Sequence, residues 1–449
     1  MIQQQLLPLP KPPKQFINFT SHLHLFHTMF YNSNVLQFKF QRSVFLVDKI
    51  KTEILSPAGD FSALQAAVRF GADAVYMGGD IFTMRAAADN SKEELKKSSE
   101  YAHKNGVKLY ITLNTLPHVE ELPMLPDYLR FLSDIGVDAV IVADLGVLSL
   151  CKKHIPNMEI HMSTQTGVVN YETANMLYEL GAKRVVLARE LTLKEIAEIR
   201  AKTPPELEIE TFVHGSMCVS FSGRCLLSQY LLGRDANRGE CAQPCRWGYH
   251  LMEEKREGLY FPIFEDKNGT YILNSKDLCM IEHLEKLAAA GVTSFKIEGR
   301  AKSDYYVGAV TNAYRLAVDG LGKEFDHRLY DELLKVSHRE YYTGFYFDEK
   351  PENSQCYKSG GYVRTYDVVG IVTGSDDNYI YLTQKNKFDK GDEIDFLIPR
   401  EVSFTQKIEE IYNEEGEIIE TANHAEMKLK IPAFRELPIG TYLRKMRKQ

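Results

Sequence analysis

Four cysteines follow one another closely in the chain, and their spacing suggests a metal centre. They are Cys218, Cys225, Cys241 and Cys245, in the pattern C-x6-C-x15-C-x3-C. Thiolates are soft ligands that hold zinc and iron–sulfur clusters. Structural zinc sites usually carry two tight C-x2-C pairs, and this segment has none. The irregular spacing therefore favours an iron–sulfur cluster, which we expect to be of the 4Fe-4S type.

The remaining cysteines carry a weaker signal. Cys279 lies in a segment that we expect to be helical, and it fits a core position as well as a spare ligand. Cys151 and Cys356 stand alone and are interpreted as core or surface residues. Seven cysteines are too few to staple a chain of 449 residues with disulfides. The first apolar stretch, Leu6 to Pro10, is too short for a secretory signal, so we expect a cytoplasmic protein.

A repeated phrase predicts the fold around these cysteines. A glycine, a small or polar pair and an apolar run recur in the segments that begin at Gly71, Gly136, Gly181 and Gly291. Such a glycine ends a helix, and the run after it is a parallel strand. Further strand candidates are Ile54–Ser56, Leu109–Asn114, Glu159–Ser163 and Glu208–His214. Eight strands that alternate with helices predict an α/β fold, a (β/α)8 TIM-like barrel.

The cysteines fall in one long connection of this barrel. The seventh strand ends near His214 and the eighth begins near Ser294, so residues 215–290 form an insertion. Loops that follow barrel strands lie at the C-terminal face, where the active sites of this fold are built. The sequence therefore predicts a cysteine-bearing insertion over the open end of the barrel.

The pattern divides the chain into four parts. Residues 1–50 are expected to be a disordered extension, although a targeting presequence stays open. Residues 51–330 form the barrel with its insertion, and residues 331–359 a linker. Alternating segments separated by turns predict a small antiparallel β-barrel domain over residues 360–449. Its basic tail, Arg444 to Lys448, is either a solvated end or a contact with RNA.

Composition limits the partners of this protein. The net charge is -7 and the pI is about 6.1, so any contact with nucleic acid must be local. No run of 18 or more apolar residues occurs, which argues against a membrane span. We therefore expect no membrane partner.

The predicted barrel interior is polar. Alternate residues of each strand face inward, and the set that packs on the helices must be apolar, which fixes the phase. The residues predicted to face inward are Tyr110, Thr112, Asn114, His161, Ser163, Gln165, Glu208, Glu210, Phe212, His214, Lys296 and Glu298. Burying an unpaired charge costs several kcal/mol, so these groups should be paired or hydrated.

These charges have two interpretations. Since strands seven and eight are neighbours, Glu210 and Lys296 should interact, and an ion-pair network that only fixes barrel register would explain them. We favour a pocket for a small organic acid, because arginines just past strand ends suit carboxylates through bidentate hydrogen bonds. The residues predicted to bind the ligand are Arg85, Asn114, His161, Gln165, Arg189, Glu210, His214, Lys296, Glu298 and Arg300.

The segment from Glu210 to Ser228, with Cys218 and Cys225, resembles the signature of the U32 peptidase (collagenase-like) family. The segments Arg234–Trp247, Asn274–Leu278 and Lys296–Arg300 match as well, and the likeness covers residues 52–449. Within the family the chain is similar to the bacterial tRNA hydroxylation proteins. The resemblance implies formation of 5-hydroxyuridine at the wobble position of tRNA, with prephenate as a required metabolite. It also implies an iron–sulfur cluster on the cysteine set Cys218, Cys225, Cys241 and Cys245.

Two other function classes stay open. One is peptide hydrolysis, as the family name implies. The sequence has no G-x-S-x-G elbow and no H-E-x-x-H helix. Ser216 is poorly placed to bond His214, while Cys218 paired with His214 is a conceivable nucleophile. The other class is a non-catalytic scaffold that uses the cluster for structure. The favoured prediction is a tRNA hydroxylase.

Overall fold

The computed structural model describes residues 52–83, 90–218, 225, 227–234, 241–244, 264–266, 269–271, 275–347 and 362–447. The predicted extension, Arg85, Cys245 and Cys356 lie outside these residues. None of the helices in these ranges has the length and apolar character needed to cross a membrane.

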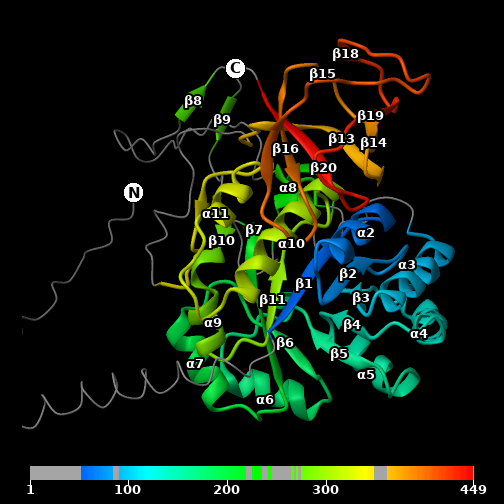
Figure 1. Ribbon diagram of the computed structural model, residues 1–449. Coiled ribbons are helices and arrows are strands. Elements are labelled where there is room, and N and C mark those ends of the chain that lie inside the picture. The colour runs from blue at the N-terminus through cyan, green and yellow to red at the C-terminus, as the bar shows by residue number, and fades with distance from the viewer. Residues whose placement is uncertain are drawn as a thin grey trace, which may run out of the picture. The chain divides into compact units, whose positions relative to one another are not determined.

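In the described part of the chain, eight parallel strands close a barrel (Figure 1). Each strand pairs with the next, and the last pairs with both the seventh and the first. The strands are β1 (Glu53–Ala58), β2 (Ala74–Gly78), β3 (Lys108–Leu113), β4 (Ala139–Val142), β5 (Glu159–Met162), β6 (Arg184–Val186), β7 (Glu208–Ser216) and β11 (Ser294–Ile297). The predicted TIM-like barrel is confirmed.

Helices surround the barrel. They are α2 (Phe61–Arg69), α3 (Lys92–Lys104), α4 (Leu125–Asp134), α5 (Leu145–His154), α6 (Tyr171–Glu179), α7 (Leu193–Ala201), α8 (Leu227–Leu232), α9 (Leu284–Ala289), α10 (Asp304–Asp319) and α11 (Arg328–Leu333). Side-chain caps start several of them; Asp60, for example, accepts from the amide of Ala63 at 2.8 Å. Gly71, at φ 103°, ends α2 as the repeated phrase predicts.

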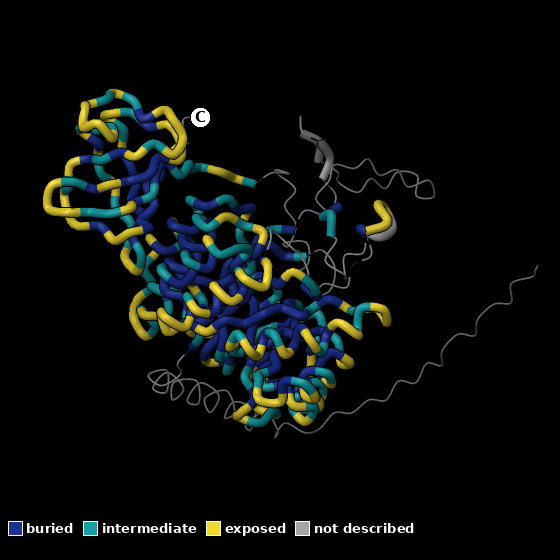
Figure 2. Tube along the Cα trace, turned by 90° about the vertical axis from the view of Figure 1, so that its right-hand side faces the viewer, coloured by how far each residue is buried: buried dark blue, intermediate teal, exposed yellow. Residues whose placement is uncertain are grey.

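Burial follows this layering, with exposed residues on the outer faces of the helices and buried ones along the strands (Figure 2). The larger core lies between strands and helices. A second, smaller cluster fills the middle of the barrel lumen with Leu55, Ala74, Tyr76, Tyr110, Ala139 and Ile141. These apolar side chains share the lumen with polar ones, since Lys296 pairs in register with Leu55 and His161 with Ile141.

Segments from outside the eight strands extend the sheet beside β7. The strand β10 (Asp277–Cys279) pairs antiparallel with β7, and β12 (Tyr341–Tyr342) pairs with β10. The segment predicted as a linker thus adds a strand to the barrel sheet. The expectation of a helix at Cys279 was wrong, because backbone pairing with β7 makes this segment a strand. Cys279 is buried beside Tyr314, and burial raises the pKa of its thiol to about 12. A hairpin of β8 (Phe264–Asp266) and β9 (Gly269–Tyr271) belongs to the insertion.

The C-terminal region folds into an antiparallel sheet with its own apolar core. Its strands are β13 (Tyr366–Ser375), β14 (Tyr379–Gln384), β15 (Phe388–Asp389), β16 (Glu393–Leu397), β17 (Phe404–Lys407), β18 (Thr421–Ala422), β19 (Lys428–Pro432) and β20 (Tyr442–Met446). Six of these strands form one sheet, in the order β17-β16-β20-β13-β14-β19. Among the described residues β17 and β19 do not pair with each other, so the sheet is a half-barrel.

The basic tail belongs mainly to the packing of this region. Arg444 on β20 is fully buried and pairs with Asp395, Nε to Oδ1 at 2.7 Å, and with Glu332 of α11. Lys445 pairs with Asp392. Neither interpretation of the tail holds for Arg444, because partners distant in sequence draw it into the contact between sheet and barrel.

Candidate active site at the barrel mouth

A cavity of about 100 Å³ lies at the C-terminal end of the barrel strands. Six residues that the sequence predicted as ligand-binding line it: Asn114, Gln165, Arg189, Lys296, Glu298 and Arg300. Tyr76, Ile141 and Phe212 supply apolar wall, and Cys218 reaches the same cavity. The structure therefore brings charged, amide and thiol groups to the face where this fold builds its active sites.

Arg300 is held in place by the opposite wall. Its Nη1 donates to Thr83 Oγ1 and to Thr112 Oγ1, both at 2.8 Å, and the guanidinium is buried. The guanidinium carbon lies 5.9 Å from the centroid of the Tyr76 ring. Because the guanidinium is already fixed, it can bind a carboxylate with little further loss of side-chain entropy.

Arg189 connects the cavity to the cysteine-bearing segment. Its Nη1 donates to the carbonyl oxygen of Ser216 at 3.2 Å, and its guanidinium carbon lies 5.3 Å from the Phe212 ring centroid. Burial opposes its charge, yet Cys218 and Glu298 together raise the pKa of Arg189 above its ordinary value. Arg189 therefore places a buried cation next to Cys218, at the start of the cysteine-bearing segment.

The predicted pair of Glu210 and Lys296 is confirmed, with Nζ to Oε1 at 2.6 Å. Glu210 is fully buried; burial would raise the pKa of its carboxyl, but Lys296 and Arg184 lower it below the usual value. Lys296 also lies 4.5 Å from the Tyr76 ring centroid and lines the cavity. Lys296 therefore lines the cavity, while its partner Glu210 also belongs to the group of charged residues below the cavity.

A network below this cavity was missed by sequence reasoning. Arg184, at the start of β6, donates to Glu53 at 2.5 Å, to Glu208 and to Glu210. Ser294 Oγ donates to Glu53 Oε1 at 2.9 Å. Because Val185 faces the helices, the alternation along the strand places Arg184 inside the lumen, and this signal could have revealed the network. This network lies at the N-terminal end of the strands, so the structural interpretation of the charges holds for the lower half of the lumen.

His161 belongs to this lower layer, since it does not line the cavity. It is fully buried, with its ring centroid 4.8 Å from that of Tyr110 in an edge-on contact. Burial, with Arg184 nearby, holds the pKa of His161 well below the ordinary value. The imidazole is therefore neutral, and its role is to fill the space between the charges.

The prediction that His214 faces the lumen was wrong. The pairing of β7 with β11 shifts at a bulge: Phe212 pairs with Lys296, but His214 pairs with the outward residue Ile297. One extra residue on β7 therefore reverses the alternation. His214 packs against α10, with Nδ1 3.4 Å from the hydroxyl of Tyr314, and burial lowers its pKa to about 3.

Three of the four predicted cluster ligands are described, and none of them is in a disulfide. Cys218, Cys225 and Cys241 are all partly exposed. The amide of Ala242 donates to Ser228 Oγ at 3.0 Å, which joins the segment of Cys241 to the helix that follows Cys225. Within the described ranges, no three cysteine, histidine or carboxylate side chains form a metal site. The cluster stays a prediction.

Two of the buried histidines, His161 and His214, predict sensitivity to acid. Both have pKa values lowered by burial, so the unfolded chain binds protons below about pH 6.5 that the folded chain does not. The stabilisation is complete above that pH and decreases as the pH falls. From pH 7 to pH 5 each histidine should lower the free energy of unfolding by about 2 kcal/mol. Urea unfolding at the two pH values checks this, and equal values would contradict it.

Comparison with known proteins divides the chain into the same two regions, the barrel and the C-terminal sheet. Residues 59–356 match peptidase family U32, and residues 364–444 match the C-terminal domain of that family. The chain is 37% identical over 403 residues to tRNA hydroxylation protein P1 of Bacillus subtilis, with 88% of this chain and 95% of that protein covered.

Two further relatives carry different names. An uncharacterized protease of Methanocaldococcus jannaschii is 46% identical over 312 residues, covering 68% of this chain and 75% of the relative. The 23S rRNA 5-hydroxycytidine C2501 synthase of Escherichia coli is 34% identical over 367 residues, covering 79% and 54%. With both family models matched and a curated relative covered almost from end to end, the chain belongs to peptidase family U32.

Proposed function

We propose that this protein is an RNA hydroxylase that forms 5-hydroxyuridine at the wobble position of tRNA. One observation carries the proposal: buried cations and a cysteine share one cavity at the C-terminal face of the barrel. Relatives named for tRNA hydroxylation and for rRNA 5-hydroxycytidine synthesis support the reaction type.

The cavity suits a small organic acid, which we propose to be prephenate. Arg300 and Arg189 would bind carboxylates through charge-assisted hydrogen bonds, and Lys296 would add a third positive group. Asn114 and Gln165 offer amides to hydroxyls, and Asn114 Nδ2 already donates to Gln165 Oε1 at 2.6 Å. A cavity of about 100 Å³ is smaller than a typical ligand pocket, so such an acid would extend from it toward the rim.

We further propose that Cys218, Cys225, Cys241 and Cys245 hold an iron–sulfur cluster beside this cavity. The donor set fits, because the three described thiols, those of Cys218, Cys225 and Cys241, are partly exposed. Cys218 lies near the buried Arg189, and Ser228 joins the segment of Cys241 to the helix that follows Cys225. When bound, such a cluster supplies one-electron redox chemistry. The chain's own residues would position the acid and exclude water from it, with Tyr76, Ile141 and Phe212 forming the apolar wall.

Peptide hydrolysis is the second candidate, supported by the family name and the relative named as a protease. The placement of His214 argues against it. Its Nδ1 faces the hydroxyl of Tyr314, and its ring lies among Tyr306, Tyr314 and Tyr341. A general base must reach the nucleophile and the substrate, and this imidazole is buried on the helix side of the strand.

Complementation of a bacterial strain that lacks its tRNA hydroxylation proteins tests the proposal. Expression of this chain should restore 5-hydroxyuridine and its derivatives in tRNA, measured by mass spectrometry of digested nucleosides, while an empty vector should not. In a separate assay, the purified protein should leave denatured collagen uncleaved. Absence of the modified nucleoside, or cleavage of the collagen, would contradict the assignment.

A further inference from the structure

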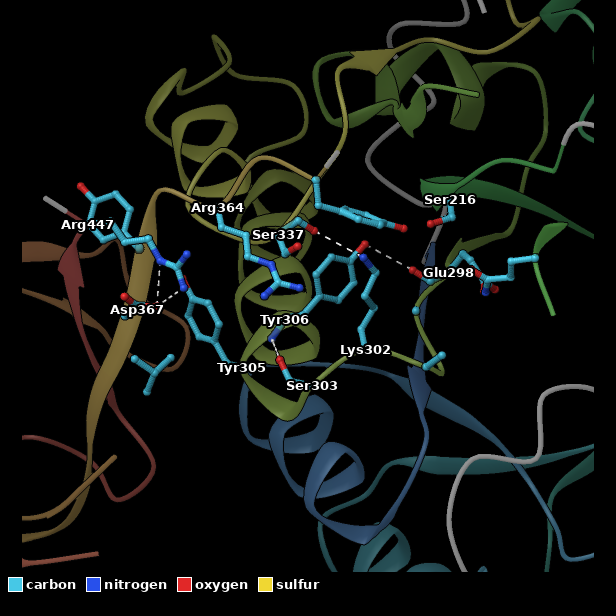
Figure 3. Close-up of a pocket in the computed structure, with 16 residues that line it drawn as sticks. Ser216, Glu298, Lys302, Ser303, Tyr305, Tyr306, Ser337, Arg364, Asp367 and Arg447 are labelled. Carbon is cyan, nitrogen blue, oxygen red and sulfur yellow. Dashed lines mark hydrogen bonds and ion pairs between the residues drawn. The ribbon is translucent and has the colours of Figure 1, made fainter. Parts of the chain in front are cut away.

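A second and larger cavity, here called the junction pocket, lies between the barrel and the C-terminal sheet. Its volume is about 530 Å³. Lys302 and Ser303 line it from the loop before α10, and Arg364, Asp367 and Arg447 line it from the ends of the C-terminal region (Figure 3). A volume of this order accommodates one nucleotide with its phosphate.

The junction pocket adjoins the barrel mouth. Glu298 lines both cavities, and Ser216, the last residue of β7, lines the junction pocket. Gln243, between Cys241 and Cys245, lines it as well. A molecule bound there would therefore lie next to the small cavity and to the cysteine-bearing segment.

The charge of the pocket suits an anion. Three cations line it against two carboxylates, those of Glu298 and Asp367. Arg447 is committed to Asp367, with Nε to Oδ1 at 2.9 Å. Arg364 is exposed, and within the described part of the chain no hydrogen bond or ion pair engages it. Figure 3 shows its guanidinium directed into the pocket between Tyr305 and Tyr306.

Aromatic rings line the same pocket and are held firmly. The hydroxyl of Tyr305 donates to the carbonyl oxygen of Lys335 at 3.1 Å and accepts from Arg444 at 3.2 Å. Lys302 Nζ lies 4.0 Å from the centroid of Tyr362 and donates to the carbonyl oxygen of Ser337 at 3.4 Å. Cations interleaved with fixed aromatic rings are the combination that binds single-stranded nucleic acid, through phosphate contacts and base stacking.

We propose that the junction pocket binds a nucleotide of the RNA substrate that neighbours the target base. Arg364 contacts its phosphate, together with Lys302, and the tyrosine rings contact its base. This inference rests on the proposed function and adds to it the place where the RNA strand is held. It also explains how a chain with a net charge of -7 engages RNA, because the contact is confined to one cleft.

Arg364→Ala tests the site by fluorescence anisotropy with a labelled, unmodified anticodon stem-loop at several salt concentrations. The variant should bind roughly tenfold more weakly, and the slope of log K against log salt should fall by about one, since one phosphate contact is lost. Arg364→Lys keeps the charge and should keep the slope. Arg435→Ala is the matched control, because Arg435 is an exposed arginine of the same region that does not line the pocket.

The outcomes separate this inference from the proposed function. Affinity and salt slope of Arg364→Ala equal to those of the unchanged protein would overturn the junction pocket as the RNA site, even where complementation restores 5-hydroxyuridine. If the unchanged protein binds no stem-loop at all, the inference is overturned as well. If complementation also fails, the proposed function is refuted with it.

Discussion

Replacing Lys296 with alanine should lower the free energy of unfolding by about 3–5 kcal/mol. Glu210 is fully buried, and among the described residues it would keep Arg184, at 3.0 Å, as its one ion-pair partner. Removing Lys296 leaves the buried carboxylate of Glu210 with one cation where two had compensated its loss of hydration. The same substitution removes a cation from the barrel mouth, so ligand binding should be lost along with stability.

Urea unfolding of three variants measures this effect. Lys202→Ala is the matched control, because Lys202 also pairs with a glutamate, Glu198, but at the surface. Its effect should be much smaller than that of Lys296→Ala, because solvent screens an exposed ion pair. The double variant Glu210→Gln with Lys296→Met should recover part of the loss, since it removes the buried carboxylate at position 210 together with its cation. Equal effects of Lys296→Ala and Lys202→Ala would show that the buried pair contributes nothing special.

Cys241→Ser should remove the iron–sulfur cluster altogether while the barrel stays folded. We expect protein purified without oxygen to hold about four iron and four sulfide per chain, with loss of both in the variant. Serine lacks the soft thiolate that binds iron, and Cys241 lies outside the barrel core, so stability of the barrel should change little.

Cys151→Ala is the control for this substitution. Cys151 is buried in α5 and lies outside the cysteine-bearing insertion, so it is not among the proposed ligands. Iron and sulfide should therefore match those of the unchanged protein. Stoichiometric zinc in place of iron, or full iron in Cys241→Ser, would refute the proposed cluster.

The fold was largely predictable because its signals are local. A glycine after each helix and an apolar run after the glycine depend only on neighbouring residues, and these phrases placed strands such as β2 and β4 correctly. The pair of Glu210 and Lys296 followed from the alternation of two adjacent strands. Such regularities need no knowledge of the rest of the chain.

The wrong predictions concern residues whose position depends on segments far away in the sequence. His214 changed sides because of a bulge in the pairing with β11, and a bulge leaves no mark in one strand's own sequence. Cys279 lies on a strand because its segment pairs with the backbone of β7. From the sequence pattern alone, a short apolar run is compatible with either a strand or a helix. Arg444 was interpreted as part of either a solvated end or an RNA contact, yet Glu332, 112 residues away, holds it in the core.

In the candidate site, too, the predictable residues are those whose position follows from local signals in the sequence. Arg189, Glu298 and Arg300 reached the cavity because they follow strand ends. The pairing of Arg184 with Glu53 was missed, because the two residues lie 131 positions apart in the sequence and only closure of the barrel brings them together. The junction pocket was not predictable, because it joins residues near 302 to residues near 364 and 447, and only tertiary contact brings them together.

We propose that the RNA is hydroxylated at the charged mouth of the barrel. The most direct measurement is the amount of 5-hydroxyuridine in tRNA from the deletion strain carrying Arg189→Met, compared with strains carrying the unchanged chain or Arg435→Met. We expect the latter two to restore the nucleoside and Arg189→Met to give at most about a tenth of it, because one charge-assisted hydrogen bond contributes roughly 1.5–3 kcal/mol. Full restoration by Arg189→Met, with the protein present at equal level, would contradict the claim.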